Sequence, residues 1–133
     1  MPEALPRHVF VYGTLRRGGR NDINRLRPAP EYVGPGIVRG VLYALGSYPG
    51  LVLGGEGAGD VAGEVYRIAP QLEAALDAIE EIVPGPHSEY FKREVAIQVA
   101  GRPLVCLVYE IHPARVRGRQ VIVHGDWMRF HAS

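Results

Sequence analysis

Hydrophobic residues fall in short runs along most of the chain, and glycine, proline or polar turn residues separate the runs. Runs of β-branched and aromatic residues are typical of strands, and the breaks between them are typical of turns. Because the breaks are short, the sequence predicts an α+β fold with a mainly antiparallel, barrel-like sheet. Strands are expected at 8–12, 32–33, 36–38, 41–45, 61–68, 91–99 and 104–111, with turns or loops at 48–50, 54–59 and 101–103 and a helical turn at 21–26.

One segment has the spacing of an amphipathic helix. Pro70 suits the first helical position, and Pro84-Gly85-Pro86 would end the helix near Val83. Apolar residues recur at helical spacing within it and define a predicted buried face. These residues are Leu72, Ala75, Leu76, Ile79 and Val83.

Glu80 lies at the edge of that face, roughly 90° from its centre at about 100° per residue, whereas Glu81 points directly away from it. A carboxylate at such an edge is either an ordinary boundary residue or a group that enters a pocket. In a pocket, desolvation raises the pKa of the carboxylate and makes it a better proton acceptor. The helical pattern alone leaves both interpretations open.

The first expected strand ends abruptly in a loop, Gly13-Thr14-Leu15-Arg16-Arg17-Gly18-Gly19. Its glycines can adopt backbone conformations that are closed to other residues. The loop is therefore either an ordinary glycine turn or a set of consecutive amides that bind an anion or an oxyanion at the strand end. Only a matching catalytic group elsewhere in the chain would separate the two interpretations.

Length and composition favour one globular domain over residues 1–133, with 47% hydrophobic residues and a formal net charge of +1. No apolar segment has the length of a membrane helix and no signal-peptide pattern is present, so we expect a cytoplasmic protein without a membrane partner. Cys106 is the single cysteine and lies in an apolar run, where we expect a buried, inert thiol. The five histidines lack metal-ligand spacing, so we expect no metal site.

Arginine is concentrated directly after the glycine loop. The cluster is a solvated face, or it is an electrostatic collar for an anionic ligand or RNA. The low net charge argues against a general nucleic-acid surface, and we expect no nucleic-acid partner. The five arginines of the cluster are Arg16, Arg17, Arg20, Arg25 and Arg27.

Five short motifs follow one another in a fixed order along nearly the whole chain. They are Tyr12–Gly18, Gly40–Pro49, Gly63–Tyr66, Leu76–Glu80 and Gly125–Trp127. In this order and spacing they resemble the γ-glutamylcyclotransferase-like family, particularly its small bacterial members. The resemblance implies a small barrel of six or seven strands, one main helix packed against it and a pocket at the mouth of the barrel.

The resemblance also implies a reaction. In this family the α-amine of a γ-glutamyl amine or γ-glutamyl amino acid attacks its own γ-carbonyl, which gives 5-oxoproline and a free amine or amino acid and needs no cofactor. Glu80 carries over as the general base, and the amides of Gly13, Thr14 and Leu15 as the cradle of the γ-glutamyl group. Tyr12 carries over as a pocket residue.

General chemistry agrees with these roles. An α-amine is protonated near neutral pH, so a carboxylate must remove a proton before the amine can attack. The tetrahedral intermediate develops an oxyanion that fixed amides can stabilise. Holding the flexible glutamyl chain bent favours ring closure. Tyr48 is a further candidate for the pocket, whereas core packing is expected for Tyr66 and a position capping the barrel for Trp127.

The chain departs from the family pattern at three places. Glu81 stands where a glycine often follows the catalytic residue, and Asn21-Asp22 replaces an Asn-His pair. A Tyr-x-Arg motif appears as Tyr90-Phe91-Lys92-Arg93, so either Tyr90 or Phe91 occupies the tyrosine position.

Two other functions compete with the enzyme. One is a non-catalytic sensor or carboxylate-binding protein that uses the same pocket, and the other is an RNA-associated module that uses the arginine cluster. The sequence does not name the leaving amine, and the expected state is a monomer or small homo-oligomer.

Overall fold

Seven strands and one main helix form the described part of the chain, residues 7–55, 57–79 and 90–132 of a computed structural model. The strands are β1 (Arg7–Val11), β2 (Glu31–Ala44), β3 (Pro49–Leu53), β4 (Gly59–Ile68), β5 (Tyr90–Val99), β6 (Arg102–Ile111) and β7 (Gln120–Val121). The helices are α1 (Pro70–Ile79) and α2 (Trp127–Ala132), and two short 3-10 helices are η1 (Ile23–Arg25) and η2 (Pro113–Val116).

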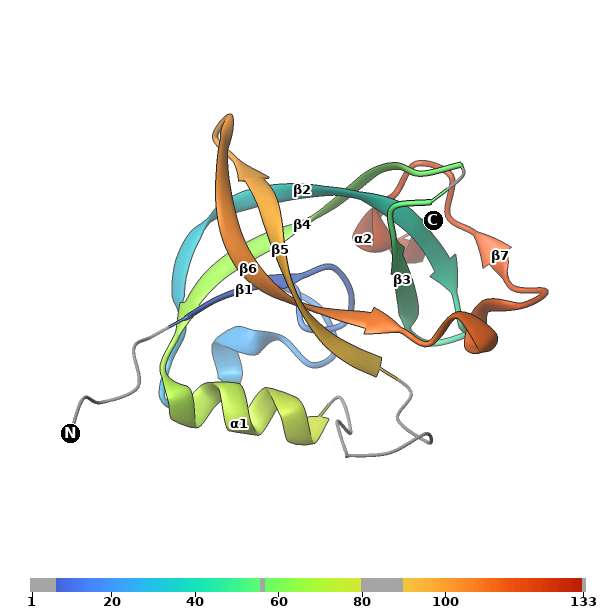
Figure 1. Ribbon diagram of the computed structural model, residues 1–133. Helices are drawn as coiled ribbons and strands as arrows, with labels where there is room; N and C mark the ends of the chain where they lie inside the picture. Colours follow the sequence, from blue (N-terminus) through green and yellow to red (C-terminus); the bar gives the residue numbers. More distant parts are fainter. Residues whose placement is uncertain (1–6, 56, 80–89, 133) are drawn as a thin grey trace.

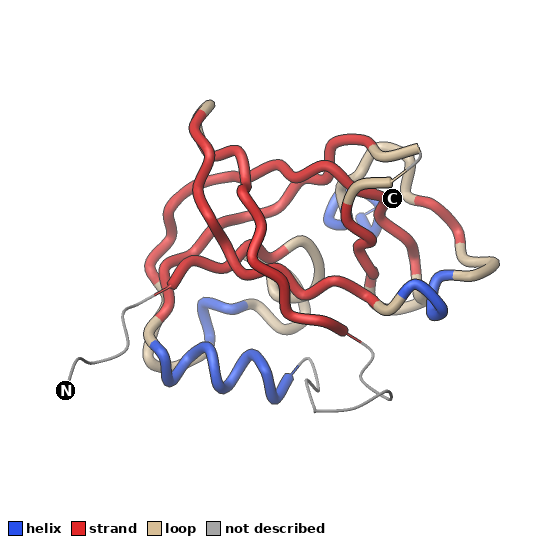
Figure 2. The backbone as a smooth tube through the Cα atoms, in the orientation of Figure 1, coloured by secondary structure: helices blue, strands red, loops and turns tan. Residues whose placement is uncertain are grey.

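Five of these strands close into a barrel (Figures 1 and 2). Their order is β2-β4-β1-β6-β5, and β5 returns to β2, where Gly36 pairs with Val99 and Ile37 with Gln98. The pairings are antiparallel except that of β1 with β6, where Val9 lies beside Leu107. β3 and β7 pair with the last residues of β2. The expected small, mainly antiparallel barrel with one main helix is therefore present.

Alternate residues of the central strands belong to two separate hydrophobic cores. On β1, Val9 packs with the cluster that includes Leu72 and Leu76 of α1, whereas Phe10 belongs to a cluster with members on all five barrel strands. Successive side chains of a strand point to opposite faces, so a strand buried on both faces reads as a continuous apolar run. The same division recurs on β6, with Leu107 and Tyr109 toward α1 and Cys106 and Val108 inside the barrel.

The prediction of three strand pieces between residues 32 and 45 is wrong, because β2 is one strand of 14 residues. Packing inside the barrel requires a glycine within this strand, because a Cβ on Gly36 would lie 2.9 Å from the side chain of Ile97 and 3.2 Å from that of Phe10. The expected turn at 48–50 also lies earlier. The Leu45 N–H donates to the Tyr48 carbonyl at 2.9 Å, and β3 already begins at Pro49.

The expected hairpin turn at 101–103 shifts by about one residue. Ala100 and Gly101 form the turn with φ of 51° and 78°, as the favoured two-residue hairpin turns require, and β6 begins at Arg102. Helix α1 begins at Pro70 as predicted, and Leu72 and Leu76 are fully buried. The predicted end of the helix lies outside the described residues.

Candidate functional site

A cavity of about 240 Å³ opens at the carboxyl end of β1. Segments that are distant in sequence form its walls: the loop after β1, the connection from β2 to β3, the last described residue of α1, the first residue of β5, and β6. All five predicted substrate-binding residues line it, namely Tyr12, Gly13, Thr14, Leu15 and Tyr48. The predicted catalytic residue, Glu80, lies outside the described residues. Ile79, which precedes it in sequence, lines the cavity.

Ile79 corrects one detail of the helical pattern. It was expected on the buried face of α1, but 42% of its surface is exposed. Ile79 lines the cavity, and a side chain on a cavity wall keeps part of its surface exposed. The carboxyl-terminal end of the described helix therefore borders the cavity.

The loop after β1 uses its carbonyls internally, and three consecutive amides of it have no acceptor among the described residues. The carbonyls of Gly13, Thr14 and Leu15 accept from the N–H groups of Arg16, Asn21 and Ile23 at 3.0, 2.9 and 2.9 Å. Among the hydrogen bonds of the described residues, none is donated by the N–H of Gly13, Thr14 or Leu15. Such a row of backbone donors on a cavity wall can bind an oxyanion or a carboxylate.

Gly13 packs directly against Pro49, which also lines the cavity. A Cβ at this position would lie 2.6 Å from Cγ and 2.9 Å from Cδ of Pro49, distances that no side chain tolerates without movement. A Cβ on Gly19 would lie 2.4 Å from the carbonyl oxygen of Thr14. The two glycines thus permit close backbone approaches that hold the loop against β3 and against itself.

Besides Tyr48, three tyrosines from different strands or strand ends line the same cavity. The Tyr12 hydroxyl donates to the Tyr109 carbonyl, and the Tyr90 hydroxyl donates to the Pro49 carbonyl at 3.1 Å. Of the two residues that could have matched the family tyrosine, Tyr90 lines the cavity, whereas Phe91 does not. Tyr109 was not predicted, because residues 106–109 of β6 are all buried and their pattern does not distinguish the two faces.

The Tyr109 hydroxyl connects the cavity to helix α1. It donates to Oδ1 of Asp77 at 2.7 Å, and Nζ of Lys92 donates to the other oxygen, Oδ2, at 2.9 Å. Lys92 also reaches Oε2 of Glu73 at 2.7 Å. Burial by itself would lower the pKa of Lys92, but the two carboxylates raise it above its ordinary value. Asp77 therefore anchors α1 to both β5 and β6.

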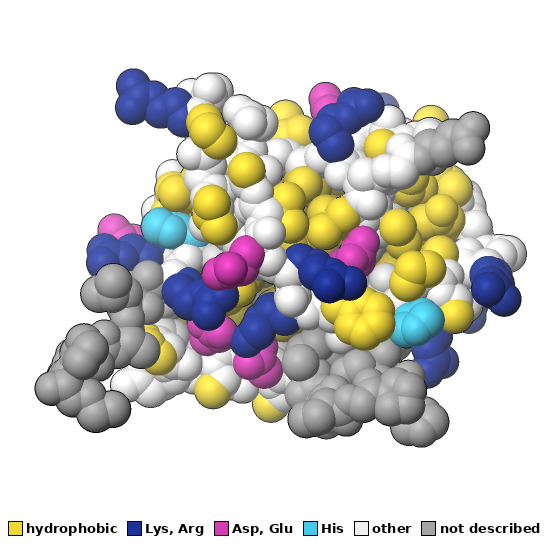
Figure 3. Space-filling model, viewed as in Figure 1, with side chains coloured by type: hydrophobic (Ala, Val, Ile, Leu, Met, Phe, Trp, Pro, Cys, Tyr) yellow, Lys and Arg dark blue, Asp and Glu magenta, His cyan; other side chains and the backbone are white. Residues whose placement is uncertain are grey.

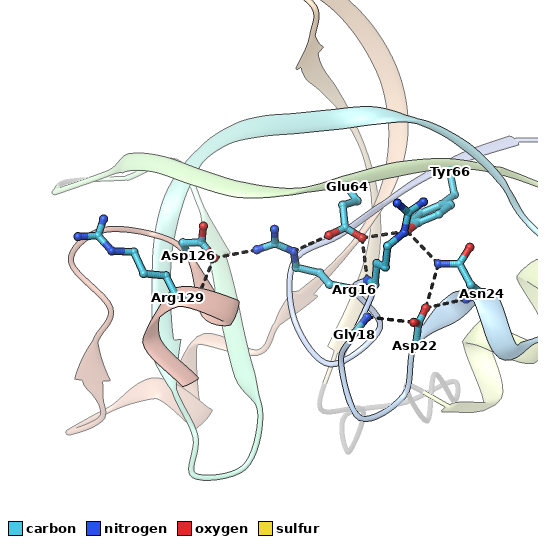
Figure 4. A network of polar contacts seen from close by, with 9 residues as sticks. Arg16, Gly18, Asp22, Asn24, Glu64, Tyr66, Asp126 and Arg129 are labelled. Atoms are coloured by element: carbon cyan, nitrogen blue, oxygen red, sulfur yellow. Dashed lines mark hydrogen bonds and ion pairs between the residues drawn. The ribbon is translucent and has the colours of Figure 1, made fainter. Parts of the chain in front are cut away.

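A second polar network holds the loop from the β4 side (Figure 4). Glu64 accepts from Nε of Arg16 at 3.0 Å, from the N–H of Arg17 at 2.8 Å and from the Tyr66 hydroxyl at 2.9 Å. Nη1 of Arg16 continues to Oδ1 of Asp126 at 2.9 Å, directly before α2. The network therefore ties the loop to β4 and to the carboxyl-terminal helix.

The network shifts the pKa values of its members in opposite directions. Burial, together with the hydrogen bond to Glu64, raises the pKa of Tyr66 to about 12, which keeps its hydroxyl a donor. Burial would raise the pKa of Asp126, but the Arg129 amide and the Arg16 guanidinium together hold it below its ordinary value. Asp22 has a lowered pKa as well, because the amides of Gly18 and Asn24 outweigh its burial.

The arginine cluster is not a uniformly solvated face. Arg16 has a side chain only 13% exposed and two carboxylate partners, and the guanidinium of Arg17 lies 4.8 Å from the centre of the Tyr32 ring. Arg27 donates to two backbone carbonyls, whereas Arg20 lines the cavity. On the face seen in Figure 3, basic and acidic side chains are intermixed. This arrangement does not favour a continuous basic surface for RNA.

The other chemical candidates of the sequence have structural roles. Cys106 is buried inside the barrel, and burial raises the pKa of its thiol to about 12. Trp127 is 2% exposed and packs with the same barrel core, as a capping position requires. The described ranges contain no group of three or more His, Cys, Asp or Glu residues that could hold a metal ion. Within the same ranges, no helix combines the length and the apolar character needed to cross a membrane.

Comparison with known proteins places this chain in one family. Residues 9–129 match the family described as gamma-glutamyl cyclotransferase, AIG2-like. A Vibrio cholerae protein provisionally named a gamma-glutamylcyclotransferase is 33% identical over 127 residues, which cover 90% of this chain and 93% of the relative. The gamma-glutamylcyclotransferase family protein YtfP of Escherichia coli K12 is 33% identical over 122 residues, 90% of this chain and 95% of its own.

A solved structure extends the likeness to three dimensions. The crystal structure of an AIG2-like protein from Mus musculus matches with a TM-score of 0.71 and 29% identity, and the match covers 85% of this chain and 84% of the mouse chain. The chain belongs to the gamma-glutamyl cyclotransferase, AIG2-like family. The family and the names of its relatives support a cyclotransferase activity.

Proposed function

We propose that this protein converts a γ-glutamyl amine or γ-glutamyl amino acid into 5-oxoproline and a free amine or amino acid. The observation that carries the proposal is the row of amides at Gly13, Thr14 and Leu15, which have no acceptor among the described residues and lie on the cavity wall. Membership of the gamma-glutamyl cyclotransferase family supports the reaction type.

The proposed reaction needs no external group. The nitrogen of the substrate's α-amine bonds to the carbon of the γ-carbonyl, and the carbonyl electron pair moves onto oxygen. The row of amides stabilises this oxyanion without reorganising, which is where backbone donors contribute most to rate. The electron pair then returns and the bond to the leaving nitrogen breaks. The α-nitrogen goes from an ammonium to a lactam N–H and so gives up two protons, and the leaving nitrogen takes up both and departs as an ammonium group. The tyrosine-lined cavity keeps the glutamyl chain bent for ring closure.

Glu80 is the proposed carrier of these protons, one at a time. An α-amine is mostly protonated at neutral pH, so a base must act before attack. Glu80 follows Ile79 in sequence, and Ile79 lines the cavity. Among the described lining residues there is no carboxylate that could act instead. These observations support Glu80 as the general base and later proton donor.

The decisive experiment is incubation of the protein with a panel of γ-glutamyl amines and γ-glutamyl amino acids, with 5-oxoproline measured by mass spectrometry. We expect release of 5-oxoproline from at least one compound. Glu80→Gln should lower turnover by about 10² to 10⁴ while ligand binding and folding remain. The adjacent Glu81→Gln is the matched control and should change turnover by only a few fold.

Two results would contradict the proposal at different points. If no compound of the panel yields 5-oxoproline, the cyclotransferase function is wrong. If Glu80→Gln is fully active, or loses no more activity than Glu81→Gln, the function stands but the assignment of the base is wrong.

A carboxylate-binding protein without catalysis is the second candidate, because the same amides would hold a carboxylate as well as an oxyanion. Saturable binding of glutamate or 5-oxoproline, with no turnover across the panel, would favour it. Equal binding by the wild type and Glu80→Gln would then be expected.

A further inference from the structure

Arg20 differs from the arginines that surround it in the sequence. Arg16 has two carboxylate partners, Arg17 lies over an aromatic ring and Arg27 donates to two carbonyls. In the part of the chain that the structure describes, the guanidinium of Arg20 makes no hydrogen bond, ion pair or ring contact. Its five N–H donors are therefore not committed to those residues.

Arg20 is also the one charged residue among the described residues that line the cavity. No Asp or Glu accompanies it there, and the amides of Gly13, Thr14 and Leu15 belong to the same wall. A fixed positive charge beside a row of N–H donors creates a positive potential in the cavity. This potential attracts an anion, whereas it does not favour the binding of a neutral ligand.

The backbone on both sides of Arg20 is held in place. The Gly19 N–H donates to the Arg16 carbonyl at 2.8 Å, and the Asn21 N–H donates to the Thr14 carbonyl at 2.9 Å. The Asn21 side chain adds a contact to the Thr14 hydroxyl at 3.2 Å. Because its neighbours are tied to the cavity wall, the exposed Arg20 side chain starts from a fixed position at the opening. Preorganisation of this kind lowers the entropic cost of ligand binding.

We infer that Arg20 binds a carboxylate of the ligand. A guanidinium matches a carboxylate with two parallel hydrogen bonds, which a lysine cannot reproduce. The inference rests on the proposed function, under which two carboxylates are available. One is the α-carboxylate of the glutamyl group, and the other is the carboxylate of a leaving amino acid, which γ-glutamyl amines lack.

The first experiment measures binding without catalysis. Isothermal titration compares 5-oxoproline with 5-oxoprolinamide, which has the same ring but no carboxylate, on the wild type and on Arg20→Gln, Arg20→Lys and Arg25→Gln. Arg25 is exposed and lies outside the cavity, so its variant is the matched control. Thermal melting of each variant confirms that it is folded.

The second experiment compares kcat/KM for γ-glutamyl-ethylamine and γ-glutamyl-alanine on the same four proteins. If Arg20 binds the glutamyl carboxylate, Arg20→Gln weakens 5-oxoproline binding about tenfold or more and lowers kcat/KM for both substrates equally. If it binds the leaving carboxylate, only γ-glutamyl-alanine is affected. In both cases Arg20→Lys falls between the wild type and Arg20→Gln, and the effect shrinks with added salt.

The remaining outcomes separate the inference from the function. If Arg20→Gln matches Arg25→Gln with every ligand and substrate while 5-oxoproline is formed, the function stands and the inference is overturned. If no substrate is turned over but Arg20→Gln still loses 5-oxoproline binding, the cyclotransferase function fails and the carboxylate site stands.

Discussion

The Nε atom of Arg16 lies 3.0 Å from Oε2 of Glu64, and each of the two side chains is only 13% exposed. The other oxygen of Glu64 accepts the N–H of Arg17 at 2.8 Å, so one carboxylate holds two consecutive residues of the cavity loop. Amides stabilise a developing charge best when they need not move during the reaction. The pair therefore positions the cavity loop without lining the cavity.

Glu64→Gln should destabilise the protein and impair catalysis. Replacing this carboxylate leaves the part-buried Arg16 with a weaker partner, which costs about 1–3 kcal/mol in the free energy of unfolding. We expect kcat to fall more than KM rises, and Glu64→Asp to recover part of kcat. Urea denaturation and steady-state kinetics check both. The control is Glu31→Gln, which removes an exposed ion pair between Glu31 and Arg67, 3.9 Å apart. In this control the free energy of unfolding and kcat should stay near the wild-type values. An equal loss there would refute the special role of Glu64.

Gly13→Ala tests the close contact between the loop after β1 and Pro49. The new Cβ would lie 2.6 Å from Cγ of Pro49, so the loop or β3 must shift. We expect turnover to fall at least tenfold, because displacement of catalytic groups by about 1 Å can cost about 10² in rate. Gly59→Ala is the control, since its Cβ would meet no atom within 4 Å. Similar kinetics for the two variants would show that the loop tolerates the contact.

Asp77→Asn should loosen the attachment of α1 to the barrel. The variant loses the ion pair with Lys92 and weakens the hydrogen bond from the Tyr109 hydroxyl. We expect a loss of about 1 kcal/mol in the free energy of unfolding, shrinking in high salt because the pair is partly exposed. Gln71→Ala, at an exposed position on the same helix, should change stability by less. Chemical denaturation at low and high salt distinguishes the two, and a salt-independent loss would contradict the ion-pair explanation.

Cys106 predicts a specific alkaline behaviour. Burial raises the pKa of its thiol from 9.0 to about 12, so the folded state holds this proton more tightly than the unfolded chain does. Its contribution to stability is therefore complete below pH 9 and is lost as the pH rises toward 12. Stability should fall less steeply in Cys106→Ala over this range. At pH 8 the native thiol should not react with a thiol reagent until denaturant is added, and rapid native reaction would show that Cys106 is accessible.

Strands β1, β4, β5 and β6 and the start of α1 followed from the sequence because local patterns determine them. Pro70, Leu72 and Leu76 carry the helix signal within seven residues, and their places in the structure match it. Gly40 misled the prediction of β2, because its small size makes room for β3 and does not mark a break in the strand: a Cβ there would lie 2.6 Å from the carbonyl oxygen of Val52. The absence of a side chain looks the same in sequence whether a glycine bends the chain or makes room for a neighbour.

The cavity was predictable as far as one continuous segment and a family motif define it. The residues from Tyr12 to Leu15 are consecutive, and they line the same cavity as Tyr48. Tyr109 could not be found in this way, because β6 is buried on both faces. Its apolar and polar residues therefore do not alternate, and the sequence does not show toward which face a side chain points. The partners of Arg16 could not be predicted from the sequence either, because Glu64 and Asp126 are distant from it along the chain and contact it only in the closed barrel.

The parallel pairing of β1 with β6 determines the order in which the barrel can assemble. Val9 on β1 pairs with Leu107 on β6, about 100 residues later in the chain. During synthesis from the amino terminus, β1, β2 and β4 therefore emerge with an uncovered apolar edge that only one of the last strands can complete. Long-range pairing of this kind slows folding and exposes unfinished sheets to association with other chains. A nascent chain that ends before β6 should aggregate, and a ribosome-bound chain should become resistant to protease only after β6 has left the exit tunnel.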